Sequence, residues 1–400
     1  MDKKYFCIFG GGGIRGAAYS GVIKAIKELD LNITGYAGSS IGAVVAGLIS
    51  FNYSPAEIKD VFDNINFEFF NDFNFNFGKD FALSKGKKFY EWMKNKIESK
   101  FYPEYDENKE YPPVKFSDIK DELVIFTVDL TTSKLFEFSK TKTPDAEIAH
   151  AIRVSVAMPG LYAPVFNEDE CLVDGDLLKG MPLSFLTPTI FGREEKILEF
   201  RLENNETKKK ISNTFDYLNA VYDTFSGVAS DFIIKQYKNY EKFDFIKINT
   251  ENISVVDFMI NKEKKQQMAN LGYRLTIDYF KNSLIQKEEK INKIYANLYQ
   301  SLKKIKFLTE NKDFMEAKAE IGELSFLLFD DLEIINKKTI KLVKNLKNVF
   351  NSNYVVKKGI FKDRANLIEY NKVLNTIKEA ILAIETKQGC WFYCIISVEN

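Results

Sequence analysis

The residues best suited to chemistry lie in the segment G-S-S-I-G at positions 38–42, which fits the pattern G-x-S-x-G. An apolar run that predicts a strand precedes this segment, and residues 43–49, all small or apolar, predict a buried helix after it. A serine at such a strand-to-helix turn exposes its hydroxyl at the helix N-terminus, where the dipole favours developing negative charge. We therefore predict that Ser40 is a nucleophile, with Gly38 and Gly42 tolerating the strained backbone of its turn.

A second glycine cluster, G-G-G-G-I-R-G at residues 10–16, follows a predicted strand and precedes a predicted helix. Contiguous glycines let backbone N–H groups turn toward a bound anion, and the helix adds its positive end. We predict an oxyanion hole serving the serine, formed by Gly11, Gly12, Gly13, Arg15 and Gly16.

The same cluster also satisfies G-x-G-x-x-G, the dinucleotide fingerprint. That fingerprint requires an acidic residue at the end of a second strand, about 20 positions further on. The candidate, Asp30, falls before the second predicted strand rather than at its end. The oxyanion-hole interpretation is therefore favoured over dinucleotide binding.

The base that activates the serine is predicted from the scarcity of histidine. His150 is the chain's one histidine, lies in a helical-looking stretch and precedes the best aspartate candidate. In the hydrolase fold with the usual elbow the order is Ser, Asp, His, and a lone histidine on a helix is more often a packing or surface residue. A carboxylate is the better candidate: Asp174 stands at a predicted strand end, where Gly175 supplies a turn that can aim it. A triad through His150 remains the alternative.

Taken together, these motifs resemble the patatin-like phospholipases, serine lipid acyl hydrolases that use a Ser–Asp dyad. The family's G-G-G-x-R-G, G-[ST]-S-x-G and D-G-[GA] motifs match residues 11–16, 38–42 and 174–175. Between them, residues 127–132 resemble the family's strand-and-turn segment, and residues 151–160 resemble its A-x-R-A-S-x-x-x-P-G stretch. The resemblance is strong over about residues 5–185. It implies that Ser40 is the nucleophile and Asp174 its base.

One residue departs from the family pattern. Asp176 stands where the family has a small residue. A second carboxylate two positions from the base could raise the pKa of that base or could point away from it. We favour Asp174 over Asp176 as the base.

Composition narrows the function class. The formal net charge is zero, which argues against general attraction to nucleic acid, and the scattered cysteines form neither a disulfide framework nor a zinc motif. No metal or cofactor is expected, because backbone amides of the predicted oxyanion hole can stabilise the negative charge that develops on the substrate. The first predicted strand begins at once and leaves no room for a signal peptide, so we expect a cytoplasmic protein. Export without a cleaved signal stays open.

The expected fold is α/β: a patatin-like core over residues 1–285, with a mainly parallel sheet between helices, and a helical region over residues 286–400. Glycine and proline become rare in the second region, and apolar residues recur there at helical spacing. A basic amphipathic stretch in it is either an ordinary solvated face or a peripheral contact with anionic membrane. Its lysines are Lys337, Lys341, Lys344 and Lys347.

The expected activity is hydrolysis of fatty-acyl esters of membrane phospholipids. Two alternatives remain open. One is acyl transfer to another alcohol or thiol by the same dyad. The other is a membrane-damaging effector whose helical region senses a ligand or an unknown protein activator.

Overall fold

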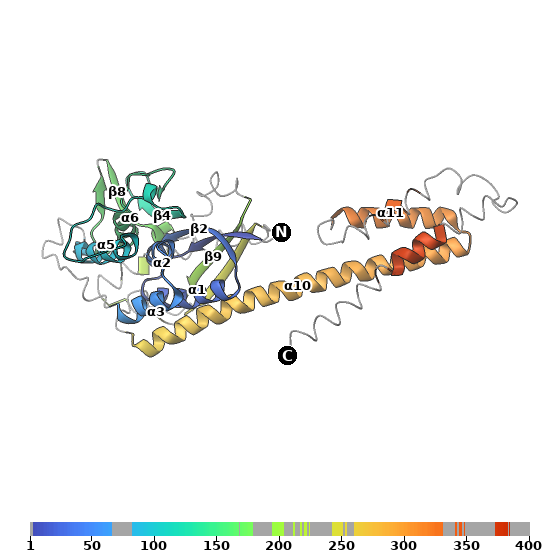
Figure 1. Ribbon diagram of the computed structural model, residues 1–400, viewed down its shortest axis with the longest axis horizontal. Coiled ribbons are helices and arrows are strands. Elements are labelled where there is room, and N and C mark those ends of the chain that lie inside the picture. The colour runs from blue at the N-terminus through green and yellow to red at the C-terminus, as the bar shows by residue number, and fades with distance from the viewer. Residues whose placement is uncertain are drawn as a thin grey trace. The chain divides into compact units, whose positions relative to one another are not determined.

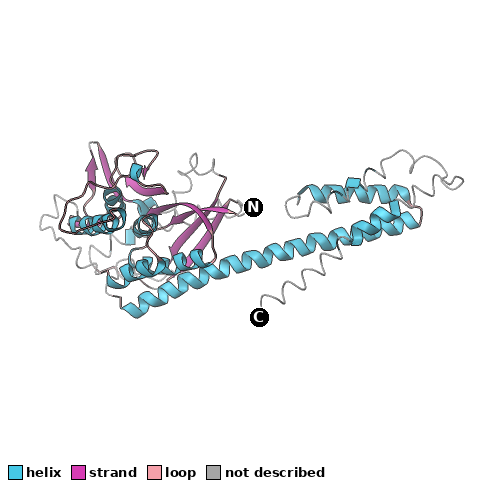
Figure 2. Cartoon of the chain, viewed as in Figure 1, coloured by secondary structure: helices cyan, strands magenta, loops and turns pink. Residues whose placement is uncertain are grey.

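The computed structural model describes residues 3–65, 82–167, 169–178, 194–203, 242–250 and 260–330, most of 373–384, and isolated positions at 211–253 and 341–348. The chain divides into two compact units, Met1–Phe280 and Lys281–Asn400. Figure 2 shows that every strand within these described ranges belongs to the first unit.

The first unit is built on an eight-stranded sheet with the order β10-β9-β1-β2-β4-β8-β7, in which β5 also pairs with β4 (Figure 1). The strands from β10 to β4 are parallel, whereas β5, β8 and β7 are antiparallel to their neighbours. The mainly parallel α/β sheet predicted from the sequence is confirmed. The strands are β1 (Lys4–Phe9), β2 (Asn32–Ser39), β3 (Ala82–Ser84), β4 (Glu122–Asp129), β5 (Lys134–Ser139), β6 (Gly160–Tyr162), β7 (Val165–Asn167), β8 (Glu170–Asp174), β9 (Lys196–Glu203) and β10 (Phe243–Asn249).

Helices connect these strands. Where the sequence supplies a cap, the helix start is well defined: the Ser54 side chain accepts from the Glu57 amide at the start of α3, and the Glu57 carboxylate accepts from the Ser54 amide. The helices are η1 (Gly13–Ala17), α1 (Ala18–Glu28), α2 (Ile41–Ser50), α3 (Pro55–Asn64), α5 (Lys87–Phe101), η3 (Phe116–Asp118), α6 (Ile148–Ser155), η4 (Gly175–Leu178), α10 (Lys262–Glu310) and α11 (Phe314–Asp330).

The core lies on both faces of the sheet, as the alternation along β1 shows. Tyr5, Cys7 and Phe9 pack into the larger apolar cluster with residues of α1, α2, α3, α5 and α6. Phe6 and Ile8 point to the opposite face and pack into a smaller cluster. Because successive strand residues face opposite sides, a strand buried on both faces is apolar throughout. Burial raises the pKa of the Cys7 thiol, so that group stays protonated.

The edge of β4 is shared by two strands. β2 pairs with the first part of β4, ending at Ser39 opposite Phe126. β8 pairs with the last part, where Asp174 lies opposite Thr127. Since β5 pairs with both Phe126 and Thr127, β2 and β8 must occupy the same, opposite edge of β4. Where the chain leaves β2 and enters α2, the rest of this edge of β4 becomes available, and β8 pairs with it.

The first turns of α10 are fixed to the first unit by close packing. A Cβ atom on Gly21 of α1 would lie 1.7 Å from the carbonyl oxygen of Ala269, and one on Gly272 would lie 2.2 Å from that of Ala18. α1 and α10 therefore approach each other backbone to backbone, which only glycine permits at these positions.

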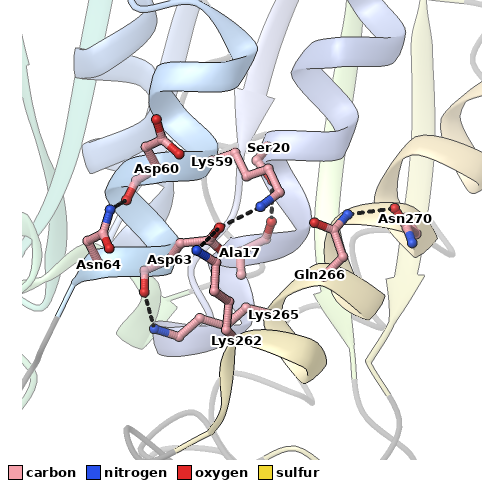
Figure 3. A network of polar contacts seen from close by, with 10 residues as sticks. All are labelled: Ala17, Ser20, Lys59, Asp60, Asp63, Asn64, Lys262, Lys265, Gln266 and Asn270. Carbon is pink, nitrogen blue, oxygen red and sulfur yellow. Dashed lines mark hydrogen bonds and ion pairs between the residues drawn. The ribbon is translucent and has the colours of Figure 1, made fainter.

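Polar contacts with the end of α3 add to this attachment (Figure 3). Lys262 forms an ion pair with Asp63, N to O 3.6 Å, and the buried Lys265 ammonium lies 3.4 Å from the carbonyl oxygen of Ile65. Burial lowers the pKa of Lys265. Together these contacts join α3 to the start of α10.

The second unit has its own apolar cluster. It is formed by residues of the later part of α10, of α11 and of the helical positions 373–384. At its centre Leu302, Ile305, Leu324 and Ile377 are fully buried. None of the helices in the described ranges combines the length and apolarity needed to cross a bilayer.

Candidate active site

Ser40 occupies the turn between β2 and α2, as the sequence predicts. It is the N-cap of α2 and is half-buried, with φ 52° and ψ −127°. Positive φ is rare for a residue with a side chain and stores strain at functional sites. The elbow therefore presents the Ser40 hydroxyl at the positive end of a helix.

The glycines of the elbow have a different role from the one expected. The strained conformation belongs to Ser40 itself, whereas Gly38 and Gly42 are not among the residues with positive φ. They are needed for space. A Cβ atom on Gly38 would lie 2.2 Å from the carbonyl oxygen of Gly42, and one on Gly42 would lie 2.0 Å from that of Phe9. The elbow fits between β1 and its own strand only because these side chains are absent.

Asp174 is in direct contact with the predicted nucleophile. The Ser40 hydroxyl donates to Asp174 Oδ2 at 2.7 Å, and the Asp174 side chain is only 1% exposed. The other carboxylate oxygen, Oδ1, accepts from the backbone amide of Asp176 at 2.7 Å. This second bond fixes the orientation of the carboxylate toward Ser40.

Gly175, like the elbow glycines, provides room rather than a left-handed turn. A Cβ atom there would lie 2.1 Å from the carbonyl oxygen of Phe126 and 3.2 Å from the Ser39 Cβ. Its φ is not positive, so the expected reason for this glycine is corrected. Without a side chain at this position, the strand that carries Asp174 closes onto β4 and the elbow.

The glycine loop lies beside the elbow, but its amides are not equivalent. The Gly11 amide donates to Asp176 Oδ1 at 2.9 Å and is therefore turned away from any substrate at Ser40. Gly12 and Gly13 follow, and Gly13 is half-buried with φ 56°. Within the described residues, neither the Gly12 amide nor the Gly13 amide donates a hydrogen bond. These two remain the candidate oxyanion donors.

Arg15, Gly16 and the nearby Tyr19 stabilise the conformation and packing of the glycine loop. Arg15 is buried, and its Nε donates to the Gly12 carbonyl oxygen at 3.1 Å. A Cβ atom on Gly16 would lie 2.4 Å from the Ile41 side chain, so η1 packs closely against α2. The Tyr19 hydroxyl donates to the Gly10 carbonyl oxygen at 2.7 Å. Burial, and secondly the charge of Asp176, raises the pKa of Tyr19, which keeps this donor protonated.

Ser155 is a site residue for which the sequence predicted no role. Its hydroxyl accepts from the Ser40 amide at 3.0 Å and donates to the Phe126 carbonyl oxygen at 2.6 Å. It is fully buried on α6. Ser155 thus joins the elbow to β4, at the residue that pairs with Ser39. The sequence signal that could have identified Ser155 is its match to the serine of the family's A-x-R-A-S-x-x-x-P-G stretch at residues 151–160.

His150 lies on the same helix but away from the dyad. It is exposed, and Ser155 lies five residues further on, about 140° around an ideal helix. The acceptor of the Ser40 hydroxyl is Asp174 rather than an imidazole. The geometry therefore favours the carboxylate over the histidine.

Asp129 holds the turn that follows β4. Its carboxylate accepts from the hydroxyls of Thr131 and Thr132 and from the amide of Cys171, at 2.6–3.2 Å. Burial opposes ionisation, but these hydrogen bonds outweigh it and lower the pKa of Asp129 from 3.8 to about 2. The contact with Cys171 attaches β8, and with it Asp174, to the end of β4.

Two further expectations concern metal and membrane contacts. Within the described residues no group of three or more histidine, cysteine, aspartate or glutamate side chains gathers in a way that could hold a metal ion. Lys341 and Lys344 are helical and exposed, whereas Lys337 and Lys347 lie outside the described residues. The membrane role of this basic stretch stays a prediction.

Residues 7–187 of this chain match the family model described as patatin-like phospholipase. A protein of Acanthamoeba polyphaga mimivirus is 25% identical over 276 residues, covering 66% of this chain and 89% of the viral protein. The probable lipid hydrolase 463L of Invertebrate iridescent virus 6 is 21% identical over 296 residues, covering 72% and 91% of the two chains.

Among solved structures, the chain is similar to VipD from Legionella pneumophila. The TM-score is 0.52 at 14% sequence identity, over 96% of this chain and 90% of that one. At this identity the likeness concerns the fold alone.

Proposed function

We propose that this chain, which carries a patatin-like phospholipase domain over residues 7–187, hydrolyses fatty-acyl esters of membrane phospholipids, with Ser40 as nucleophile and Asp174 as base. The observation that carries the proposal is the 2.7 Å hydrogen bond from the Ser40 hydroxyl to the buried Asp174 carboxylate. A nucleophile within hydrogen-bond reach of a base, at a helix N-terminus beside the backbone amides of a glycine loop, is the arrangement that acyl transfer requires. The match of residues 7–187 to the patatin-like phospholipase model supports a lipid as the substrate.

In the first half of the reaction, Ser40 Oγ attacks the ester carbonyl carbon while Asp174 accepts the hydroxyl proton. The carbonyl oxygen becomes an oxyanion, which the amides of Gly12 and Gly13 and the N-terminus of α2 stabilise. Collapse of the tetrahedral intermediate breaks the ester C–O bond. The departing lysophospholipid alkoxide takes the proton from Asp174, and the acyl group remains on Ser40.

In the second half, Asp174 accepts a proton from water as the water oxygen attacks the acyl-enzyme carbonyl. The second tetrahedral intermediate uses the same amides, and its collapse releases the fatty acid while Ser40 Oγ recovers its proton from Asp174. No step of this proposal requires a metal ion, because backbone N–H groups stabilise the oxyanion and Asp174 supplies the proton that the leaving oxygen takes.

The test is a product analysis on mixed phospholipid vesicles, with fatty acids and lysophospholipids measured by mass spectrometry. Wild type should release both products, and Ser40→Ala should release neither. Ser50→Ala is the matched control, because Ser50 is a buried serine at the far end of the same helix whose hydroxyl donates to the Ala46 carbonyl oxygen. This control should behave as wild type.

Adding an alcohol acceptor to the same assay separates hydrolysis from transfer. Free fatty acid as the main product supports hydrolysis, whereas a new ester of the added alcohol as the main product would assign an acyltransferase. Inactive wild-type protein that gains activity with a cell extract would instead support a gated effector. Equal release of products by wild type and Ser40→Ala would contradict the proposal.

A further inference from the structure

Asp176, the residue that departs from the family pattern, lies at the centre of the site. Its side chain is 3% exposed. Its Oδ1 accepts from the Gly11 amide at 2.9 Å and from the Ser39 hydroxyl at 3.2 Å. Its own amide donates to Asp174 Oδ1 at 2.7 Å. One residue therefore contacts the glycine loop, the elbow and the base.

The packing around this carboxylate is as specific as its hydrogen bonds. A Cβ atom on Gly11 would lie 2.4 Å from Asp176 Cγ, so the loop backbone rests directly on the side chain. A buried carboxylate is costly unless hydrogen bonds compensate for its lost hydration. Here an amide and a hydroxyl do so, each from a different part of the site. Glycine or alanine at this position could make neither contact.

The bond to Gly11 also decides which loop amides can act on a substrate. With its N–H directed at Asp176, Gly11 is an anchor, and the loop continues through Gly12 and Gly13, whose φ values are 155° and 56°. Gly13 and Ser40 are both half-buried, whereas Gly11, Gly12 and Asp176 are buried. Anchor and donors are thus neighbouring parts of one short loop.

We propose that Asp176 is a positioning residue for the reaction. Its carboxylate accepts hydrogen bonds from both the Gly11 amide and the Ser39 hydroxyl, and so fixes the oxyanion donors of the glycine loop relative to Ser40. This role rests on the proposed function, since it concerns the same hydrolysis. It assigns Asp176 no proton transfer and no contact with substrate. A small shift of preorganised donors weakens transition-state stabilisation, and therefore affects kcat more than substrate binding.

The experiment compares full-length wild type, Asp176→Ala and Asp176→Asn on a soluble nitrophenyl ester. kcat is expressed per serine titrated by a fluorophosphonate, so that unfolded protein does not count. Asp176→Ala should lower kcat by at least about 30-fold, somewhat less than deletion of an oxyanion donor, with KM within about threefold of wild type. Asp176→Asn keeps an oxygen that can accept from Gly11 and should restore kcat to within about fivefold of wild type.

The matched control is Glu98→Ala, which removes a buried carboxylate of α5 that contacts neither the loop nor the elbow; its side chain is 4% exposed and pairs with Lys94. It should leave kcat per titrated serine within about twofold, whatever it does to stability. An equal loss of kcat in Glu98→Ala and Asp176→Ala would overturn the proposal, because the effect would then reflect general loosening.

Three other outcomes bear on the role. Unchanged or higher kcat in Asp176→Ala would mean that release of the Gly11 amide does no harm, and would overturn it. Loss of activity in Asp176→Asn as large as in the alanine variant would make the negative charge the essential property, and would also overturn it. If Asp176→Ala gives no folded protein, Asp176→Asn decides alone: activity within about fivefold of wild type supports the role, and a larger loss contradicts it.

Failure of this proposal is distinguishable from failure of the proposed function. Wild type and Ser40→Ala are assayed in parallel. Inactive wild type would refute the hydrolase itself, whereas active wild type with unaffected Asp176→Ala would refute only the positioning role.

Discussion

Ser39 and Asp174 lie opposite consecutive residues of β4, although they belong to different strands. Ser39 pairs with Phe126 at the end of β2, and Asp174 pairs with Thr127 at the end of β8. One strand therefore sets the register of both halves of the candidate dyad. Ser40, the next residue after Ser39, is thereby brought to 2.7 Å from the carboxylate.

The first prediction separates a dyad from a triad. Asp174→Asn should lower turnover of a nitrophenyl ester by at least about 10³-fold, because it removes the base that contacts Ser40. His150→Asn should stay within about tenfold of wild type, because His150 is exposed on α6 and does not accept the serine proton. Steady-state kinetics, with folding checked by circular dichroism, measures both. Collapse of activity in the folded His150→Asn variant would contradict the dyad.

The second prediction concerns Ser155. Ser155→Ala should lower kcat about 10- to 100-fold and destabilise the fold by about 1–3 kcal/mol, because the amide of Ser40 loses its buried acceptor. Kinetics and urea unfolding measure the two effects. Ser50→Ala, which removes another buried hydroxyl at the edge of the core, should leave kcat unchanged. Equal kcat in both variants would show that the Ser155 contact does not orient the elbow.

The third prediction is a pH dependence of stability. The pKa of Asp129 is lowered to about 2 by hydrogen bonds that are lost on unfolding. A carboxyl group with a depressed native pKa stabilises the fold above its unfolded pKa, here 3.8, and this contribution disappears as the pH falls through the native value.

Asp129→Asn should accordingly destabilise the protein at pH 7 by about 1.5 kcal/mol or more, the scale of a hydrogen bond to a charged group. The difference from wild type should shrink between about pH 4 and pH 2. Urea unfolding at several pH values measures it. A difference that stays constant down to pH 2 would contradict the ionised, hydrogen-bonded state of Asp129.

The fourth prediction tests the basic stretch of the second unit. If exposed Lys341 and Lys344 contact an anionic membrane, binding to anionic vesicles should weaken as salt shortens the Debye length from about 10 Å at 0.1 M to about 3 Å at 1 M. The double variant Lys341→Glu/Lys344→Glu should impair hydrolysis of vesicles but not of a soluble ester. Vesicle flotation and the two activity assays measure this. Equal rates on vesicles for variant and wild type would leave the stretch as a solvated helix face.

Local motifs made the elements around the glycine loop and the elbow predictable. The apolar runs before each motif are β1 and β2, and the small apolar run after Ser40 is α2. Each of these units is contiguous in sequence, so periodicity and turn chemistry are enough to find it. The α/β class followed from their alternation.

Contacts between distant segments could not be predicted in this way. Nothing local indicates that β8 takes the edge of β4 that β2 leaves, or that Asp176 accepts from Gly11. The roles of Gly38, Gly42 and Gly175 were expected from backbone conformation, but each depends on how closely another segment approaches. Register and close approach are properties of the assembled sheet, and a single sequence carries no direct record of them.

The most direct test of the central claim is covalent capture of the nucleophile. Wild-type protein is treated with a fluorophosphonate, which reacts with an activated serine, and the modified peptide is identified by mass spectrometry. One adduct on Ser40 is predicted, with labelling slowed by at least about 10³-fold in Asp174→Asn, because the carboxylate that accepts the Ser40 proton is gone. An adduct on another serine, or equally fast labelling of Ser40 in Asp174→Asn, would contradict the Ser40–Asp174 dyad.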